Sequence, residues 1–307
     1  MTTTSAEPTG IARLQMEEEQ LISESLLKRA LRRLWHDRLT MTAISVIVIL
    51  AILSIGAPFI SEQILNTDYS RVDMAATFLK PGEQGHILGT DDLGRDHLAR
   101  LLWGGQVSLG IGFTAAILSI TIGVSIGIFT GYYGGIVDDL IMWFITTINS
   151  IPSLFLLLIF AALFDPGPLG LILVLGFLGW TGTTRLVRGE TFSLREREFV
   201  ISARAAGATD LRIMFVHILP NLISIVVVTL AIDIGVLILV ESGLSYLGLG
   251  VPPPTPSWGN MLTDSQSFIN RAPHLVILPG LLITITVLCL YVIGDGIRDA
   301  FDPTIVD

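Results

Sequence analysis

The feature that most constrains this chain is a series of six apolar segments, each close to the length that crosses a lipid bilayer. A transmembrane helix needs about 20 predominantly apolar residues. The segments cover approximately residues 40 to 60, 106 to 130, 139 to 163, 168 to 187, 222 to 243 and 275 to 294. Of the 307 residues, 51% are hydrophobic and 15% are charged, which excludes an ordinary soluble domain. The sequence predicts an all-α membrane protein with six transmembrane helices.

The distribution of basic residues predicts how these helices are oriented. Lys and Arg are retained on the cytoplasmic side of a membrane. If the N-terminus lies inside, only five of the 18 Lys and Arg residues fall in outer segments: Arg71, Lys80, Arg95, Arg100 and Arg271. We therefore expect both termini and the loop from residue 188 to residue 220 to be cytoplasmic.

The N-terminal region has the pattern of a helix that lies on the membrane surface. It contains no short apolar core followed by a small-residue cleavage site, so we expect an uncleaved anchor as the first span. Between Leu21 and Arg38, apolar residues recur at helical spacing with basic residues between them. This pattern predicts an amphipathic interfacial helix, although a soluble helix that binds a partner would have the same pattern.

The first outer loop, residues 61 to 105, is long enough to fold on the surface. Residues 90 to 92 (Thr-Asp-Asp) are expected to cap a helix that leads into the second span. The same charged cluster extends to Arg95 and Asp96, and it could instead dock a binding protein or hold the loop through ion pairs. We favour capping because a charge cluster at a helix start usually serves the helix.

A polar segment from Glu198 to Asn221 lies between two long apolar runs and predicts two short helices around a break at Gly207. Small residues lead into this glycine, which suits a helix end where φ turns positive and a partner approaches closely. Thr209 is expected to cap the second helix, with Asp210 in its first turn. This helix would have one apolar side, formed by Leu211, Phe215, Ile218 and Leu219. A protruding surface of small residues at the membrane surface predicts a matching groove on another protein.

The sequence offers no confident catalytic or metal site. Its histidines are scattered, and no pair has metal-ligand spacing on one helix. Neither Lys28 nor Lys80 lies in a GxxxxGK[ST] context, so the chain has no P-loop and is not expected to hydrolyse ATP. The single cysteine, Cys289, excludes an internal disulfide, and the net charge of -9 argues against nucleic acid as a partner.

Two carboxylates, Asp233 and Glu241, lie in the fifth apolar segment. An ionisable group at that depth is costly unless it faces a cavity or a partner. The two residues are about 80° apart round a helix and roughly 12 Å apart along it, so they share one broad side. Both are candidates for lining a pathway. The alternatives are a hydrogen-bonded packing role for Asp233 and a structural role near the outer interface for Glu241.

The polar segment resembles the EAA motif of the membrane permeases of binding-protein-dependent ABC importers. That motif reads Glu-Ala-Ala, three residues, Gly, nine residues, a hydrophobic residue, one further residue and Leu-Pro. In register, this chain has Ile201, Ser202, Ala203, Gly207, His217, Leu219 and Pro220, so Ile201 departs from the glutamate of the family. Four further segments are similar to the C-type permease of dipeptide and oligopeptide importers: residues 89–102 (GTDDLGRDHLARLL), 131–138 (GYYGGIVD), 244–262 (LSYLGLGVPPPTPSWGNML) and 294–303 (GDGIRDAFDP).

This resemblance, which runs from about residue 25 to the C-terminus, implies a type I ABC importer permease fold in the inner (plasma) membrane of a prokaryote. It implies a heterodimer with a second homologous permease, two cytoplasmic ATPase subunits that bind ATP and Mg, and an external solute-binding protein. Membrane lipid would surround the membrane-spanning part of this chain. The residues implied to contact the ATPases are Ser202, Ala203, Ala206, Gly207, Ala208, Thr209 and Asp210. Di- or oligopeptides are the first expected substrate, and nickel chelates, glutathione and oligosaccharides are the alternatives.

The resemblance also divides the chain into parts. We expect a cytoplasmic tail with the interfacial helix at 1–39, an anchor at 40–60, an external loop at 61–105, a permease core at 106–297 with a coupling loop at 188–220, and a cytoplasmic tail at 298–307. A secondary transporter would normally show inverted repeats, broken spans and several intramembrane polar sites. An intramembrane enzyme would need a Ser/His, paired Asp or metal set at membrane depth. The sequence favours the permease over both.

Overall fold

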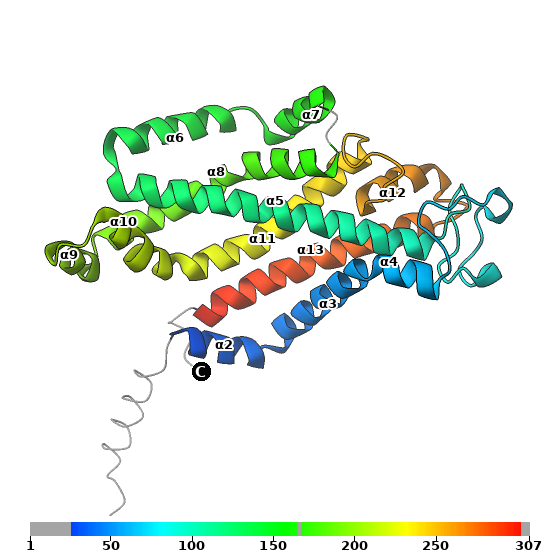
Figure 1. Cartoon of the computed structure of the whole chain (residues 1–307), viewed down its shortest axis with the longest axis horizontal. Helices are drawn as coiled ribbons and strands as arrows, with labels where there is room; N and C mark the ends of the chain where they lie inside the picture. Colours follow the sequence, from blue (N-terminus) through cyan, green and yellow to red (C-terminus); the bar gives the residue numbers. More distant parts are fainter. Residues whose placement is uncertain (1–25, 165–166, 302–307) are drawn as a thin grey trace, which may run out of the picture.

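A computed structural model describes residues 26–164 and 167–301, and within them the chain is helical, with no β-strand. Five stretches are long and apolar enough to span a membrane: α3 (Arg38–Ile55), α5 (His97–Tyr133), α8 (Pro168–Arg195), the continuous run of α10, η4 and α11 (Asp210–Tyr246), and α13 (His274–Phe301). They run along the long axis of the molecule (Figure 1). The expected all-α membrane fold is confirmed.

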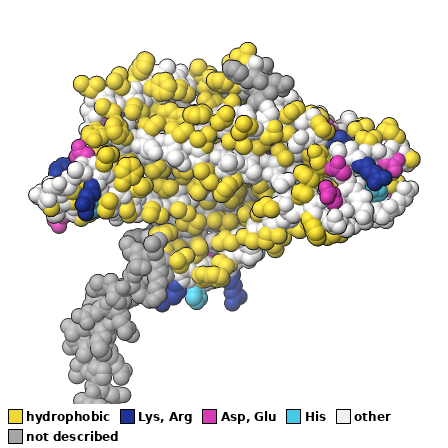
Figure 2. Space-filling model, in the orientation of Figure 1, with side chains coloured by type: hydrophobic (Ala, Val, Ile, Leu, Met, Phe, Trp, Pro, Cys, Tyr) yellow, Lys and Arg dark blue, Asp and Glu magenta, His cyan; other side chains and the backbone are white. Residues whose placement is uncertain are grey.

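The shorter elements connect or flank these spans. They are α2 (Leu26–His36), α4 (Ala57–Phe59), η1 (Ile60–Ile64), η2 (Met74–Ala76), η3 (Glu83–Gly85), α9 (Glu198–Ala205), α10 (Asp210–Arg212), η4 (Ile213–Ile218), α12 (Trp258–Ser265) and η5 (Gln266–Phe268), and α11 itself is Leu219–Tyr246. Helices α9 and α10 lie at one end of the long helices, whereas α12 and the loop after α4 lie at the other (Figure 1). Figure 2 shows hydrophobic side chains over the middle of one face and charged side chains mainly at the ends and beside α2.

The third predicted span, residues 139 to 163, is broken into two helices. Helix α6 (Gly135–Asn149) and helix α7 (Ser153–Phe164) are separated by three residues, and the pair is bent by 77°. Pro152 lies in the break, and proline both lacks an N–H donor and disfavours helical backbone at the residue before it. The described part of the chain therefore has six candidate spans only if the bent pair counts as one.

Helices α5 and α8 form the tightest pair in the core because glycines on α5 remove the side chains between them. A Cβ added at Gly123, Gly127 or Gly131 would lie 2.7, 2.8 or 2.6 Å from a Cβ atom of Thr183, Val187 or Thr191 respectively. Both sets recur every four residues, which places each on one helix face. Small residues at such spacing allow backbones to approach closely in lipid. Helices α5 and α8 therefore pack with their backbones in close approach.

Glycines near the end of α13 connect it to two other helices. A Cβ at Gly294 would lie 3.1 Å from Ile232 Cγ1 of α11, and one at Gly296 would overlap the Thr40 side chain of α3. Thr40 is 1% exposed, and the carboxylate of Asp37 accepts hydrogen bonds from the Leu39 and Thr40 backbone N–H groups at the start of α3. The Thr40 hydroxyl also donates a hydrogen bond to this carboxylate. It is the largest cause that holds the pKa of Asp37 below its ordinary value, and the backbone hydrogen bonds add to it.

Helix α2 has the two faces expected of an interfacial helix. Ala30 is buried, whereas Leu31 and Trp35, which are four residues apart, are exposed on one side of the helix. Trp and Leu on one face of a basic helix are typical of helices in the headgroup region. The predicted helix began at Leu21, but residues before Leu26 lie outside the described part of the chain.

The start of α5 differs from the sequence-based prediction. The helix begins at His97, and its cap is Asp96, whose side chain accepts a hydrogen bond from the Ala99 backbone N–H at 2.8 Å. Residues 90 to 92 do not cap it. Asp91 instead accepts hydrogen bonds from the backbone N–H groups of Leu93 and Arg95 in the turn before the helix. The helix starts later than expected because Gly94, with φ +72, separates this turn from α5.

Candidate coupling loop and translocation groove

The polar segment forms the predicted pair of helices around Gly207. Helix α9 ends with the Ala206 N–H bonded to the Ser202 carbonyl, and Gly207 follows with φ +83. The Thr209 hydroxyl then accepts a hydrogen bond from the Arg212 N–H at 3.4 Å and caps α10. A left-handed residue after a helix end is a common helix stop, and glycine adopts it without steric cost.

The seven residues expected to contact ATPases lie together on this loop, and most of their surface is open. Ser202, Ala206, Gly207, Thr209 and Asp210 are exposed, whereas Ala203 and Ala208 are half-buried. A Cβ at Gly207 would meet nothing within 4 Å. Within the subunit there is thus space for a side chain here, and only a protein that binds from outside could restrict it. The loop therefore presents a smooth surface of small residues at the end of the molecule (Figure 1).

The base of this loop is anchored by an apolar cluster and one hydrogen bond. Val200, Ile213 and Ile218 are fully buried, together with Tyr132 at the end of α5. The Tyr132 hydroxyl donates to the Asp210 carboxylate at 2.7 Å. Although Asp210 is exposed, it thus ties α10 to α5 and does more than complement the helix dipole. Sequence reasoning missed Tyr132, although it lies in the GYYGGIVD segment that carried the resemblance.

The apolar side predicted for the second helix is only partly buried in the subunit. Leu211, Phe215 and Leu219 line one hollow beside α5, but Leu211 and Phe215 are 62% and 61% exposed. Ile213 and Met214 are buried in addition to Ile218. Residues 213 to 218 are π-helical, and each residue turns less around the axis than in an α-helix, so a pattern read at 3.6 residues per turn does not identify which of them are buried.

Two arginines of α8 join neighbouring ends of α5, α6 and α8. The Arg188 guanidinium forms a two-pronged ion pair with the Asp138 carboxylate of α6, and Asp138 is 4% exposed. Arg195 donates to the Gly131 carbonyl at 3.1 Å and to the Tyr132 carbonyl at 3.3 Å at the end of α5. The broken span and the base of the coupling loop are thereby fixed to α8.

Glu241 lies inside the subunit and not on a pathway surface. It is 0% exposed, and its carboxylate accepts hydrogen bonds from Ser108 at 2.9 Å, Ser245 at 2.7 Å and Ser242 at 3.4 Å. The Ser108 oxygen accepts in turn from the Trp258 N–H at 3.2 Å. A buried carboxylate with this many partners stabilises a junction between helices. The structure therefore places Glu241 at a joint between α5, α11 and α12, where it cannot line an open pathway.

Asp233 has a different environment from Glu241. It is half-buried, and its carboxylate accepts one hydrogen bond, from the Thr183 hydroxyl of α8 at 3.3 Å. Asp233 and Glu241 were expected on one broad side of the helix, but they do not face a common cavity. Asp233 faces α8, whereas Glu241 faces α5. Asp233 lies where α8 and α11 face each other.

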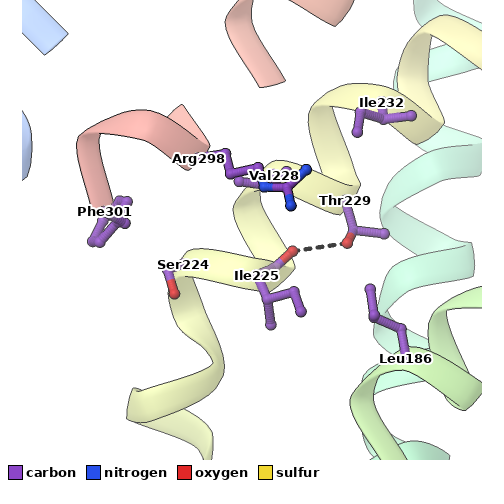
Figure 3. Close-up of a pocket in the computed structure, with 8 residues that line it drawn as sticks. All are labelled: Leu186, Ser224, Ile225, Val228, Thr229, Ile232, Arg298 and Phe301. Atoms are coloured by element: carbon purple, nitrogen blue, oxygen red, sulfur yellow. Dashed lines mark hydrogen bonds between the residues drawn. The ribbon is translucent and has the colours of Figure 1, made fainter. Parts of the chain in front are cut away.

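A cavity of about 570 Å³ opens next to this position, between α8, α11 and α13. Leu186 of α8 and Arg298 and Phe301 of α13 lie round it, and α11 contributes Ser224, Ile225, Val228, Thr229 and Ile232 (Figure 3). Ile232 precedes Asp233 in the chain, and Leu186 follows Thr183 by one turn. We call this cavity the α8–α11 groove; Asp233 and Thr183 are not among the residues that line it.

The end of the molecule opposite α9 and α10 carries a network of ion pairs that joins the loop before α5 to α12. Arg95 Nε lies 2.6 Å from Asp91, Arg100 Nε lies 3.5 Å from the same carboxylate, and Arg100 NH2 lies 3.3 Å from Asp264. Burial raises the pKa of Asp264, although Arg100 and Arg95 oppose this shift. These contacts support the interpretation that the cluster holds the loop through ion pairs, while Asp96 of the same cluster caps α5.

Within residues 26–164 and 167–301, no group of three or more His, Cys, Asp or Glu side chains could hold a metal ion. The exposed coupling loop and the α8–α11 groove are thus the two features that suggest function. One is an exposed surface that another protein could bind, and the other is a cavity between α8, α11 and α13.

Comparison with known proteins connects these two features. Residues 123–307 match the family described as binding-protein-dependent transport system inner membrane component, and residues 25–81 match the N-terminal TM domain of oligopeptide transport permease C. The oligopeptide transport system permease protein OppC of Haemophilus influenzae is 36% identical over 290 residues, 94% of this chain and 92% of that protein. The glutathione transport system permease protein GsiD of Pectobacterium atrosepticum is 37% identical over 236 residues, 77% and 76% of the two chains.

A solved structure supports the fold. It is titled as inward facing conformations of the MetNI methionine ABC transporter, and it matches with a TM-score of 0.53 and 19% identity. The match covers 65% of this chain and 95% of that one. At this level of identity the likeness concerns architecture alone, and it agrees with the type I importer permease fold.

Proposed function

This chain belongs to the family of binding-protein-dependent transport system inner membrane components, and from that premise we propose that it is the C-type permease subunit of an ATP-driven importer of peptides. It forms one half of the translocation pathway and pairs with a second homologous permease. An external solute-binding protein delivers the substrate. Two partner ATPases bind ATP and Mg and contact the coupling loop, so the chain has no ATPase site of its own.

The observation that carries this proposal is the coupling loop. An exposed surface of small residues around Gly207 is attached to the end of α5 by Tyr132, and Arg195 joins that end of α5 to α8. A surface that is smooth outside and rigidly anchored inside is suited to transmit a movement from a docked protein. Conformational changes of transport proteins are largely rigid-body movements of such packed units.

The proposed orientation follows from charge. Helix α2 carries four basic residues and α8 carries three, and these helices would lie on or end at the cytoplasmic side, with both termini. The external loop and α12 would face the solute-binding protein. This orientation places the coupling loop where cytoplasmic ATPases can reach it.

Di- or oligopeptides are the proposed cargo because the N-terminal match and the OppC relative carry that name. A relative named for glutathione keeps a second cargo open, and glutathione is itself a small peptide. Nickel chelates and oligosaccharides remain alternatives for the same machine. Asp233 is the proposed pathway residue, since it is a half-buried acidic group within a membrane-spanning helix, where α11 faces α8.

Substitution of Gly207 tests the coupling role. Gly207→Val forces a branched side chain onto φ +83 and adds bulk to the surface that docks the ATPases. We expect the complex to insert in the membrane, with uptake reduced at least tenfold and either ATP hydrolysis uncoupled from uptake or the ATPases released. The measurements are peptide uptake, ATPase activity and co-purification of the ATPases.

Gly85 provides a matched control. It has φ +89, and a Cβ there also meets nothing within 4 Å, but it lies in the external loop. Gly85→Val introduces the same kind of backbone strain far from the coupling loop, and its ATPase coupling should stay intact. Normal uptake and normal assembly in Gly207→Val would contradict the proposed coupling role.

A further inference from the structure

Arg185 is a charged residue in the apolar part of α8, and the subunit gives it one long hydrogen bond. Its side chain is exposed, and its guanidinium donates to the Thr146 hydroxyl of α6 at 3.4 Å. Within residues 26–164 and 167–301 it forms no ion pair. Arg188, one turn further on, is bound instead to the buried Asp138 carboxylate. A guanidinium has five N–H donors, so most of those of Arg185 remain for a group outside the subunit.

The hydrogen bond of Arg185 belongs to a row of polar contacts between α6 and α8. One turn before Arg185, the Thr181 hydroxyl donates to the Asn149 side-chain oxygen at 3.3 Å. Thr181 and Arg185 are four residues apart on α8, and Thr146 and Asn149 are three apart on α6, so each pair lies on one helix face. We call these four residues the α6–α8 seam. Thr146, Asn149 and Arg185 are exposed, whereas Thr181 is buried.

The seam ends at the break between α6 and α7. Helix α6 stops at Asn149, and Ser150 and Pro152 in the break are exposed. A helix end leaves backbone carbonyl groups without their helical N–H partners. Within a membrane, such irregular backbone is found where it is buried in protein or lines a water-filled cavity, and not against lipid. This surface therefore faces water or another subunit.

The seam lies well away from the ends of the two helices that form it. Arg185 is ten residues before the end of α8 at Arg195, about 15 Å along the axis. Thr146 is eleven residues after the start of α6 at Gly135, about 16 Å from the same end of the molecule. The guanidinium thus reaches sideways to α6 at its own level and does not extend to the helix end. A charge within a span is costly unless it faces a cavity or a partner.

Glycines leave the side of α8 next to Arg185 open. A Cβ at Gly182 or Gly189 would meet nothing within 4 Å, and both residues are exposed. They lie three residues before and four residues after Arg185, so all three share one helix face. Thr184 and Val187 face the other way and are buried against α5. The guanidinium is therefore accessible from outside the subunit along this face.

We propose that the α6–α8 seam and the adjoining glycine face of α8 line the translocation pathway, and that Arg185 binds the α-carboxylate of the peptide that passes. This inference rests on the proposed function, and it names the substrate class as peptides with a free carboxyl end. It does not depend on Asp233, whose partner Thr183 lies two residues from Arg185 and about 200° round the helix.

The chemistry of the seam fits this ligand. A guanidinium binds a carboxylate with two parallel hydrogen bonds, which are stronger than bonds between neutral groups. The side chains of Thr146 and Asn149 offer hydroxyl and amide groups, which exchange hydrogen bonds with a peptide backbone. The α-carboxylate and the backbone are common to peptides of any sequence. Contacts to these groups alone suit a carrier of varied peptides, because they do not select among side chains.

An anionic lipid headgroup is the other source of an anion for Arg185, and the neighbouring residues disfavour it. A lipid bound there would place acyl chains against the exposed Asn149 side chain and the break at Pro152. Polar side chains and irregular backbone are costly to leave in contact with hydrocarbon. The experiments below separate the lipid from the peptide.

The first test compares trialanine with its C-terminal amide in the complete transporter, reconstituted with its ATPases and binding protein. The quantity measured is the ratio of kcat/KM for the free peptide to kcat/KM for the amide. Arg185→Gln should lower this ratio about fivefold relative to wild type, and Arg185→Lys should retain part of it. Arg38→Gln removes an exposed charge at the start of α3 and should leave the ratio unchanged. Any preference of the binding protein is the same in all variants and cancels.

The second test asks whether the seam is wet and whether peptide covers it. In the assembled complex with Cys289→Ala, Gly182→Cys should react with a water-soluble maleimide, because its Cβ has free space and faces the pathway. Ile49→Cys, at an exposed position within α3, should not react. Trialanine at millimolar concentration should slow the reaction at Gly182→Cys more than its amide does, and Arg185→Gln should remove that difference.

Three outcomes would overturn the inference. If Arg185→Gln lowers uptake of both peptides by the same factor, Arg185 serves a lipid or the second permease and not the substrate. An effect seen in vesicles with phosphatidylglycerol but not in vesicles of phosphatidylcholine alone assigns Arg185 to lipid. An unreactive Gly182→Cys in a complex that transports trialanine removes the seam from the pathway but leaves the proposed function intact. A wild-type complex that transports no peptide contradicts the proposed function itself.

Discussion

A single carbon added at Gly127 should push α5 away from α8. A Cβ there would lie 2.8 Å from Val187 Cβ, 2.9 Å from Val187 Cγ1 and 2.9 Å from the Thr184 carbonyl oxygen. The carbonyl belongs to the backbone and cannot rotate away. Ordinary carbon contacts lie at about 3.5–4.0 Å, so the helices must separate by roughly 0.7–1 Å. Such overpacking costs about 1–3 kcal/mol, and the better helix propensity of alanine offsets at most about 1 kcal/mol.

We therefore expect Gly127→Ala to destabilise the subunit by about 1–2 kcal/mol, which lowers the Tm of the purified full-length protein by several degrees. Gly110→Ala is the matched control, because it lies on the same helix and a Cβ there meets nothing within 4 Å. Its Tm should stay the same or rise. Thermal unfolding of both variants in the same detergent decides the matter, and equal Tm changes would refute the packing argument.

Three further predictions follow from the contacts of single residues. Glu241→Leu should lower the Tm more than Glu241→Gln, because the serine hydroxyls around it lose every acceptor; the reverse order would contradict its role at a helix junction. Asp138→Asn should destabilise the subunit by about 1–3 kcal/mol, whereas Asp139→Asn, which is exposed, should have little effect; similar Tm values for both would show that the ion pair to α8 adds nothing. In a chain without its native cysteine, Ser193→Cys should react with an impermeant maleimide only from the cytoplasm and Lys80→Cys only from outside, and reversed labelling would exclude the proposed orientation.

The membrane spans could be predicted from the sequence because long apolar runs leave few alternatives in a bilayer. The five continuous candidate spans overlap the predicted segments, although several helices extend well beyond the apolar part, such as α5 from His97 to Tyr133. Pro152 favours a bend at its position, but the apolar run continues on both sides of it, so hydropathy alone predicts one continuous span. Hydropathy reports where the chain is apolar and not whether its axis is straight.

The coupling loop was predictable because local rules fix its backbone. Gly207 and Thr209 have the roles that their residue types favour at helix ends. The buried face of the following helix was not predictable, since the π-helical turn at residues 213 to 218 changes the periodicity. Local residue preferences describe a helix end well, whereas a change of helix type depends on the tertiary packing around it.

The role of Glu241 could not be read from the sequence because its partners come from distant segments. Ser108 precedes it by 133 residues, and Trp258, which shares the Ser108 hydroxyl, follows it in α12. A carboxylate in an apolar run has the same sequence pattern whether it faces a pathway or a ring of hydroxyl groups. Only the packing of the helices separates these two cases, as it does for Asp233 and Glu241.

The helix contacts lead to an expectation about how the coupling loop acts on the α8–α11 groove. At the outer end, α5 and α11 are held together, because Ser108 bonds Glu241 and a Cβ at Gly112 would lie 2.3 Å from Ile238 Cγ1. At the other end, α8 is packed on α5 and α11 on α13, and the cavity lies between these pairs. Only two residues join α8 to α9, so a displaced α9 moves the end of α8 directly. Spin labels at Leu186 and Ser224 should therefore change their separation when the ATPases bind nucleotide, while labels near the Ser108–Glu241 junction keep theirs. A change of equal size at both ends would mean that the subunit moves as one body and that the groove is not gated by the coupling loop.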